Sequence, residues 1–233
     1  MAAIVEMRGV QFSWSYKGSD VLAIDELTVQ QGERLFLKGP SGSGKSTLLN
    51  LLSGVIVPRS GSIAVLGQEL SALSGARRDR FRADHVGYIF QLFNLVPYLT
   101  VIDNVLLSHR FSRRRRERVE QKGARAEAER LIGHLGLGSE LAYRKATELS
   151  VGQQQRVAAA RALIGSPELV IADEPTSALD ADTRQAFIQL LNAECQACGS
   201  TLIFVSHDSS LEPLFDRRLS LSDINRAAAV REN

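Results

Sequence analysis

The segment from Gly39 to Thr47 has the residue types and the spacing needed to bind phosphate. It follows the pattern G-x-x-x-x-G-K-[ST] and lies between a short predicted strand, Arg34–Lys38, and a predicted helix that includes Leu48–Leu52. Backbone N–H groups of such a loop, together with the positive end of the helix dipole, form an anion cradle. The lysine can reach the outer phosphates and the serine hydroxyl can bind Mg²⁺. We therefore expect a nucleotide to be bound by Gly39, Pro40, Ser41, Gly42, Ser43, Gly44, Lys45, Ser46 and Thr47.

Two adjacent acids follow a second apolar run. Leu169–Ala172 reads as a buried parallel strand, and Asp173 and Glu174 come directly after it. In phosphate-binding α/β folds the ligand lies beyond the carboxyl ends of the strands. We expect Asp173 to hold Mg²⁺ and Glu174 to act as the general base on a water in line with the γ-phosphate. A positioned base contributes roughly 10²–10⁴-fold in rate.

Two further polar residues end predicted strands. His207 follows the apolar run Leu202–Val205, and Gln91 follows Val86–Phe90. The histidine is expected to contact the γ-phosphate and to orient the attacking water. The neutral amide of Gln91 is expected to contact Mg²⁺ or that water, which makes Glu174, His207 and Gln91 the candidate catalytic set.

A second helix start also carries anion-binding features. Ser150 and Gly152 stand just before an alanine-rich helix and offer a hydroxyl and a bare backbone. An ordinary helix N-cap is the alternative interpretation. Two phosphate-binding helix starts in one chain predict that two copies face each other, each capping the nucleotide held by the other.

Composition limits the class of protein. The chain has 233 residues, 44% of them hydrophobic, and a net charge of +2, so nothing in the total charge demands a nucleic acid partner. No apolar run approaches the roughly 20 residues that span a bilayer, and the N-terminus does not read as a secretory signal. We expect a cytosolic protein that works on a membrane only through a partner. Cys195 and Cys198 form a C-x-x-C pair inside a predicted helix, and buried thiols are favoured over a redox pair or half of a zinc site, because no matching ligands lie nearby.

The secondary-structure pattern divides the chain into a sheet core and a helical insert. The first third is rich in strand signals, the segment from Leu92 to about Leu163 is helical, and two apolar strands with a long helix between them follow. The pattern predicts an α/β fold with a β-rich N-terminal part. The expected core comprises residues 1–91 and 164–233, and the inserted helical subdomain residues 92–163.

Six motifs in order resemble the nucleotide-binding subunit of an ATP-binding cassette (ABC) transporter over nearly the whole chain. They are Walker A at Gly39–Thr47, the Q-loop at Gln91, the signature at Leu149–Gln153, Walker B at Leu169–Glu174, the D-loop at Ser177–Asp180 and the switch histidine at His207.

This resemblance implies one nucleotide-binding domain, residues 1–233, with a P-loop NTPase (RecA-like) core. It implies an ATPase coupled to transport, with ATP and Mg²⁺ as ligands, and Ser46, Gln91 and Asp173 around the metal. Further contacts to the nucleotide are implied for Trp14, with Tyr16 as the alternative aromatic, and for Ser150, Gly152, Gln153 and Asp180. The implied partners are a second copy and an integral-membrane permease, at the cytoplasmic face of the membrane.

One residue departs from the family pattern. The signature usually has glycine where this chain has Val151. A valine there would be strained if the position required a positive φ. Because Ser150 and Gly152 are intact, we expect function to survive with weaker closure of the dimer.

The subfamily is indicated by finer resemblance. Gly39–Leu52, Phe90–Pro97 and Asn104-Val105 resemble the ATPases of lipoprotein-releasing and macrolide-efflux complexes. The alternatives are a regulatory cell-division cassette that moves no substrate, and an importer ATPase. The short tail after the final predicted strand, Arg217–Leu221, favours the exporter type over the importer. The basic run Arg113–Arg116 is interpreted as a solvated helix face, with contact to anionic lipid or a permease loop as the alternative.

Overall fold

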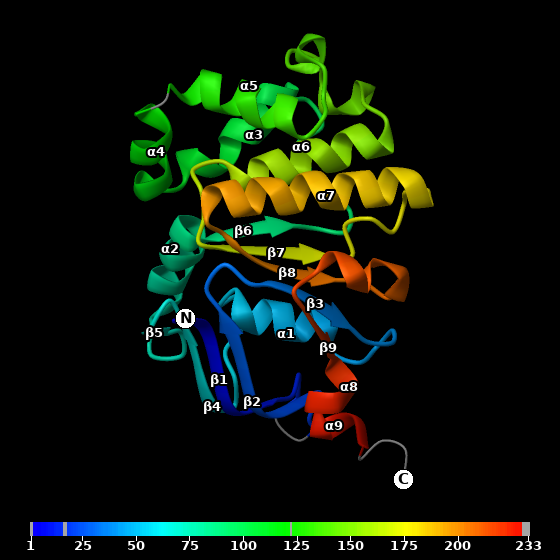
Figure 1. Ribbon diagram of the computed structural model, residues 1–233. Coiled ribbons are helices and arrows are strands. Elements are labelled where there is room, and N and C mark those ends of the chain that lie inside the picture. Colours follow the sequence, from blue (N-terminus) through cyan, green and yellow to red (C-terminus); the bar gives the residue numbers. More distant parts are fainter. Residues whose placement is uncertain (1, 16–17, 122, 230–233) are drawn as a thin grey trace. The chain divides into compact units, whose positions relative to one another are not determined.

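The computed structural model describes residues 2–15, 18–121 and 123–229 (Figure 1). The chain divides into two compact units. The first unit comprises the chain up to Arg82 and from Phe204 onward; the second comprises Ala83–Ile203. These bounds differ from the predicted core and insert, because β6 and α7 contact the helix α6 and β7 pairs with β6, all in the second unit. The division into residues 1–91 with 164–233 and residues 92–163 stays a prediction.

An antiparallel sheet of four strands opens the first unit, in the order β2-β1-β4-β5. Its strands are β1 Ala3–Phe12, β2 Leu22–Gln30, β4 Ser60–Val65 and β5 Gln68–Glu69. Val5 lies opposite Val29 on one side and Val65 on the other, and all three are fully buried. Alternating apolar residues thus place one face of the sheet in the core.

The phosphate-loop segment belongs to the same unit. β3, Arg34–Lys38, pairs in parallel with β9, Arg217–Ser220, and leads through the loop into α1, Lys45–Leu52. The predicted strand–loop–helix arrangement is therefore present. Phe36, Phe204 and Phe215 pack their rings with centroids 5.0–6.3 Å apart and fill the core beside β3.

Short helices complete the first unit. These are α2 Gly75–His85, which crosses into the second unit, the 3₁₀ turn Ser209–Leu214, α8 Leu221–Ile224 and α9 Arg226–Ala229. The last two contact β2, so the tail after β9 is packed against the sheet.

The second unit is mainly helical. Its helices are α3 Val101–Arg110, α4 Arg113–Glu120, α5 Ala124–His134, α6 Val151–Leu163 and α7 Ala181–Cys198, with 3₁₀ turns at Ser139–Leu141 and Ala146–Glu148. α3 contacts α4, α5 and α6. Thr100 caps α3 and Ser112 caps α4, each accepting a hydrogen bond from the backbone three residues on.

Two parallel strands lie in this unit beside α6. β6, Val86–Ile89, pairs with β7, Leu169–Asp173, and the helix passes so close to β6 that a Cβ on Gly87 would lie 2.4 Å from the Ala162 carbonyl oxygen. β8, Thr201–Val205, begins beside β7, where the Thr201 N–H donates to the Glu168 carbonyl. The strand that leads to the predicted acids, β7, is fully buried from Leu169 to Ala172.

Candidate functional site

The P-loop takes a conformation that only small residues permit. Gly42 and Gly44 have φ of 77° and 101°, values that L side chains rarely adopt. Gly44 is the N-cap of α1, and a Cβ there would lie 2.8 Å from Leu22 Cδ2. Because these two glycines have no side chain, the backbone N–H groups at the start of the helix stay open, as a phosphate cradle requires.

Lys45 is held over this loop. Its side chain is almost fully buried, and its ammonium Nζ donates to the carbonyl oxygens of Gly39 (2.8 Å) and Pro40 (3.0 Å). The structure thus places the charge of Lys45 at the mouth of the loop, where phosphate oxygens would be bound.

His207 and Trp14 belong to the same unit. Ser206, directly after β8, donates its N–H to the carbonyl of Leu37, two residues before Gly39. His207 follows as an exposed residue. Trp14 is 64% exposed, with its ring edge-on to Phe12 at 5.0 Å. Its open indole face can stack on a base. Tyr16 lies outside the described residues.

The two acids predicted from the sequence end β7 in the second unit. Asp173 is the last residue of the strand, and the next residue, Glu174, has φ 44°. A non-glycine residue in this region costs on the order of 1–3 kcal/mol and such residues concentrate at functional sites. Both side chains are half-buried. They are therefore still accessible to solvent, although the strand end fixes their backbone.

Tyr88 is a neighbour of Asp173 that the sequence did not reveal. It lies on β6 opposite Ile171 and forms a side-chain hydrogen bond with Asp173. Burial first, and then the negative charge and hydrogen bond of Asp173, raise the pKa of Tyr88 well above its usual value. The phenol therefore stays protonated and orients the carboxylate.

The segment after Gln91 is strained and fastened to α6. Phe93 and Asn94 both have positive φ, and their carbonyl oxygens accept hydrogen bonds of 2.5 and 2.7 Å from the buried guanidinium of Arg161. Burial lowers the pKa of Arg161, whose charge is met here by carbonyl dipoles. The chain that follows Gln91 is thus tied to the helix that the signature begins.

The signature forms a complete capping box at the start of α6. Ser150 Oγ accepts from the Gln153 N–H at 3.3 Å, and Gln153 Oε1 accepts from the Ser150 N–H at 2.9 Å. The Gln153 amide predicted to contact nucleotide is thus engaged in the cap. Val151 is the first residue of the helix, without a positive φ, and its side chain is 48% exposed. The strain considered for this valine is therefore not present.

Asp180 caps the next long helix. Its carboxylate accepts from the Thr183 N–H at 2.9 Å at the start of α7. Backbone and side-chain hydrogen bonds from Thr183 lower the pKa of Asp180. The D-loop residue thus keeps its negative charge near a helix N-terminus.

The candidate metal ligands are of a type that suits Mg²⁺. Ser46, Gln91 and Asp173 offer a hydroxyl, an amide and a carboxylate oxygen, and Mg²⁺ is usually held by one or two carboxylates together with substrate phosphates. Within residues 2–15, 18–121 and 123–229 no group of three His, Cys, Asp or Glu side chains is arranged to hold a metal. Taken one by one, the oxygen donors of these three residues are of the kinds that Mg²⁺ takes.

The match to a family model decides the identity. Residues 22–177 match the model described as "ABC transporter". The chain belongs to the ABC transporter family. It is an ATP-binding and ATP-hydrolysing cassette of the LolD and MacB type.

Relatives of this cassette cover nearly its whole length. It is 37% identical over 224 residues to the lipoprotein-releasing system ATP-binding protein LolD of Syntrophotalea carbinolica, covering 95% of this chain and 96% of that protein. It is 38% identical over 228 residues to the macrolide export ATP-binding/permease protein MacB of Escherichia coli, covering 96% of this chain but 34% of that protein. Among solved structures, the dimeric cassette MJ0796 bound to ADP and Pi matches with a TM-score of 0.80 and 33% identity, over 93% of each chain. The predicted fold class, family and ATPase activity are confirmed.

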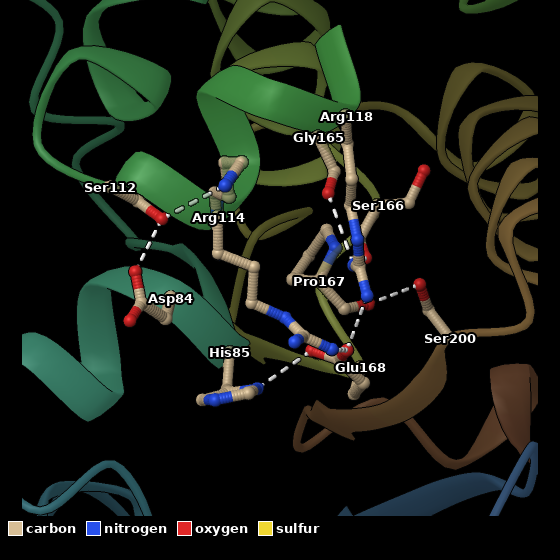
Figure 2. Close-up of polar contacts among 11 residues, drawn as sticks. Asp84, His85, Ser112, Arg114, Arg118, Gly165, Ser166, Pro167, Glu168 and Ser200 are labelled. Carbon is tan, nitrogen blue, oxygen red and sulfur yellow. Dashed lines mark hydrogen bonds and ion pairs between the residues drawn. The ribbon is translucent and has the colours of Figure 1, made fainter.

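A charged cluster in the cassette joins α4 to the segment between α6 and β7 (Figure 2). The Glu168 carboxylate accepts from Arg114 Nη2 (2.6 Å) and Arg118 Nη2 (2.8 Å) and lies 2.9 Å from His85 Nδ1. Arg118 also donates to the Ser166 carbonyl at 2.6 Å. Burial alone would raise the pKa of Glu168, but the hydrogen bonds from His85, Arg114 and Arg118 outweigh it and hold the pKa far below its usual range.

The cluster corrects the interpretation of the basic run. Arg115 is fully buried, and burial lowers its pKa to about 10, while Arg114 and Arg118 face Glu168. Within the run Arg113–Arg116, three residues are thus exposed to solvent, as the sequence interpretation expected, and Arg115 is the exception. The two cysteines were expected to be buried thiols. Both are free thiols in the structure; Cys195 is buried and Cys198 is half-buried. No helix in the described part of the cassette is long and apolar enough to cross a bilayer.

Proposed function

We propose that two copies of this cassette bind two Mg-ATP at a shared interface and hydrolyse them to drive a membrane permease. Each nucleotide would lie between Lys45 of one copy and Ser150 and Gly152 of the other. One observation carries this proposal: the same chain has a phosphate loop at the start of α1 and a capped, exposed signature at the start of α6. The solved relative MJ0796 is a dimer bound to ADP and Pi, which supports a dimeric cassette that binds nucleotide.

The chain's own residues divide the work in the proposed site. The N–H groups of the P-loop and Lys45 bind the phosphates and Trp14 stacks on the base, with further contacts to the nucleotide from Asp180 and Gln153. Glu174 takes a proton from the attacking water, and His207 and Gln91 orient that water. Mg²⁺, held by Ser46, Gln91 and Asp173, would neutralise the negative charge of the phosphates.

The permease partner is inferred from the exposed residues beside Gln91. Leu92 is 83% exposed and Tyr98 is 74% exposed, and both stand in the segment that Arg161 ties to α6. Contiguous exposed apolar surface marks interaction sites, and these two residues are the ones that we propose to contact the permease. Movement of this segment would be passed to the permease, with the cassette at the cytoplasmic face of the membrane. The similarity to LolD and MacB favours a role in lipoprotein release or efflux.

Mixing two inactive variants tests the shared site. Lys45→Ala removes the phosphate-binding charge, and Ser150→Arg blocks the signature. In a mixed pair, the P-loop of the Ser150→Arg copy faces the signature of the Lys45→Ala copy, so one intact site forms. In an equal mixture with random pairing, about half of the pairs are mixed, and each mixed pair has one intact site of two. Roughly a quarter of the parent ATPase activity should therefore return. A mixture no more active than the sum of its two components would contradict the shared site.

A further inference from the structure

The buried amide of Asn225 joins the C-terminal segment to the P-loop. Its side chain is 3% exposed. The amide nitrogen donates to the carbonyl oxygens of Val21 (3.0 Å) and Ser43 (3.3 Å). The amide oxygen accepts from the N–H groups of Ala23 (2.9 Å) and Ala227 (3.2 Å). A primary amide has two donor hydrogens and two acceptor lone pairs, so Asn225 is saturated.

One of these bonds fixes the orientation of a peptide group inside the P-loop. Ser43 stands between Gly42 and Gly44, which both have positive φ and little resistance to rotation. In a trans peptide the carbonyl and the following N–H point in opposite directions. Because the Ser43 carbonyl points at Asn225, the Gly44 N–H points away from it. Backbone N–H groups are what a P-loop offers to phosphate oxygens.

We propose that Asn225 is a positioning residue for nucleotide binding, which acts through the Ser43–Gly44 peptide without touching the nucleotide. The inference rests on the proposed role of the P-loop. Asn225 holds the Gly44 N–H in the orientation in which it donates to a phosphate oxygen, so less binding free energy is lost in ordering this peptide. The Val21 and Ala23 contacts fix the amide itself to the start of β2.

The contact also makes the C-terminal segment responsive to nucleotide. Coupling between two sites is reciprocal. If Asn225 orders the P-loop for phosphate, then phosphate at the loop must order Asn225 and its neighbours. Segment Leu221–Ala229 should therefore become more protected when ADP binds.

Asn104 provides a matched control in the second unit. It is also a buried asparagine with four hydrogen bonds, donating to the carbonyls of Val96, Leu99 and Thr100 and accepting from the Val96 N–H. Asn104→Ala therefore removes a similar buried network without touching the P-loop. The test measures ADP affinity by titration calorimetry, and thermal midpoint, for the parent, Asn225→Ala, Asn225→Asp and Asn104→Ala.

We expect the two Asn225 variants to bind ADP about threefold to tenfold more weakly, the effect of one lost hydrogen bond. Asn225→Asp keeps the acceptor oxygen for Ala23 and Ala227 but has no donor for Ser43, so it should lose at least as much affinity as Asn225→Ala. Asn104→Ala should lower the thermal midpoint and leave the ADP affinity within error of the parent. Parent-like ADP affinity in both Asn225 variants would overturn the inference, whereas a parent that binds no ADP would overturn the proposed function instead.

Hydrogen exchange on the parent gives a test that needs no folded variant. With saturating ADP, peptides covering Leu221–Ala229 should exchange more slowly, together with those covering Gly39–Thr47. Peptides around Asn104 serve as the reference for general stabilisation. A protected P-loop with unchanged exchange in the Asn225 segment would contradict the coupling.

Discussion

Replacing Glu168 with glutamine should weaken the cassette by about 2 kcal/mol at neutral pH. The carboxylate is 19% exposed and lies within 2.9 Å of nitrogens on three basic residues (Figure 2). Breaking a fully buried ion pair costs about 3–5 kcal/mol, and an exposed pair is worth about 0–1 kcal/mol. The partners Arg114 and Arg118 are 45% and 36% exposed, so the expected cost lies between these limits. For a chain of this length, that is a fall of about 4–8 °C in thermal midpoint.

The effect of Glu168 should also fade in acid. Its pKa is lowered in the folded protein. Its stabilisation is therefore complete above the unfolded pKa of about 4.3 and is lost as pH falls toward the folded value. Urea unfolding of the parent and of Glu168→Gln should differ by a constant amount from about pH 5 to 7 and should converge below about pH 4.

Glu117 supplies the control for this measurement. It pairs with Arg113 at 2.7 Å on the same helix, but the two side chains are 56% and 80% exposed. Glu117→Gln should cost no more than about 0.5 kcal/mol. The reasoning is refuted if Glu168→Gln is no less stable than Glu117→Gln, or if the difference from the parent does not change in acid.

Three further substitutions test individual features of the site. Gly44→Ala should lower the thermal midpoint and ADP affinity, because φ is 101° and the new Cβ would meet Leu22; Gly67→Ala, with φ 72° but open space, should show only the backbone cost of about 1–2 kcal/mol. Val151→Gly should lower the unfolding free energy in urea by up to about 1 kcal/mol, since the valine is unstrained in a helix; a more stable variant would show that strain exists there. Tyr88→Phe should cost about 1–2 kcal/mol in urea unfolding, because the Asp173 carboxylate loses its hydrogen bond, and an unchanged midpoint would count against that contact.

The sequence predicted the parts of the fold that depend on local pattern. β3 spans Arg34–Lys38 as expected, since an apolar run followed by a glycine-rich loop leaves little alternative. α2, Gly75–His85, was missed because it buries none of its side chains and so shows no apolar periodicity. The helical segment expected from Leu92 begins only at Val101, after a strained turn held by Arg161.

Contacts between distant parts of the chain could not be predicted from one sequence. Arg115 is buried where its guanidinium donates to the Ala162 carbonyl, and Arg114 pairs with Glu168; both partners lie about 50 positions away, which no local pattern reports. Asn225 lies in what reads as a plain tail, yet its amide reaches Ser43. Motif spacing identified the residues expected to act on phosphate, whereas Tyr88, Arg161 and Asn225, which orient them, became visible only in the fold.

The mass of the Glu174→Gln variant with Mg-ATP tests the central claim most directly. With the proposed base removed, hydrolysis should fall by about 10²–10⁴-fold and ATP should stay at the shared interface. Light scattering after size exclusion should then give twice the 25.5 kDa of one chain with Mg-ATP, and a single-chain mass with Mg-ADP. A variant that hydrolyses ATP like the parent, or that binds ATP and keeps the single-chain mass even with its permease present, would contradict the account.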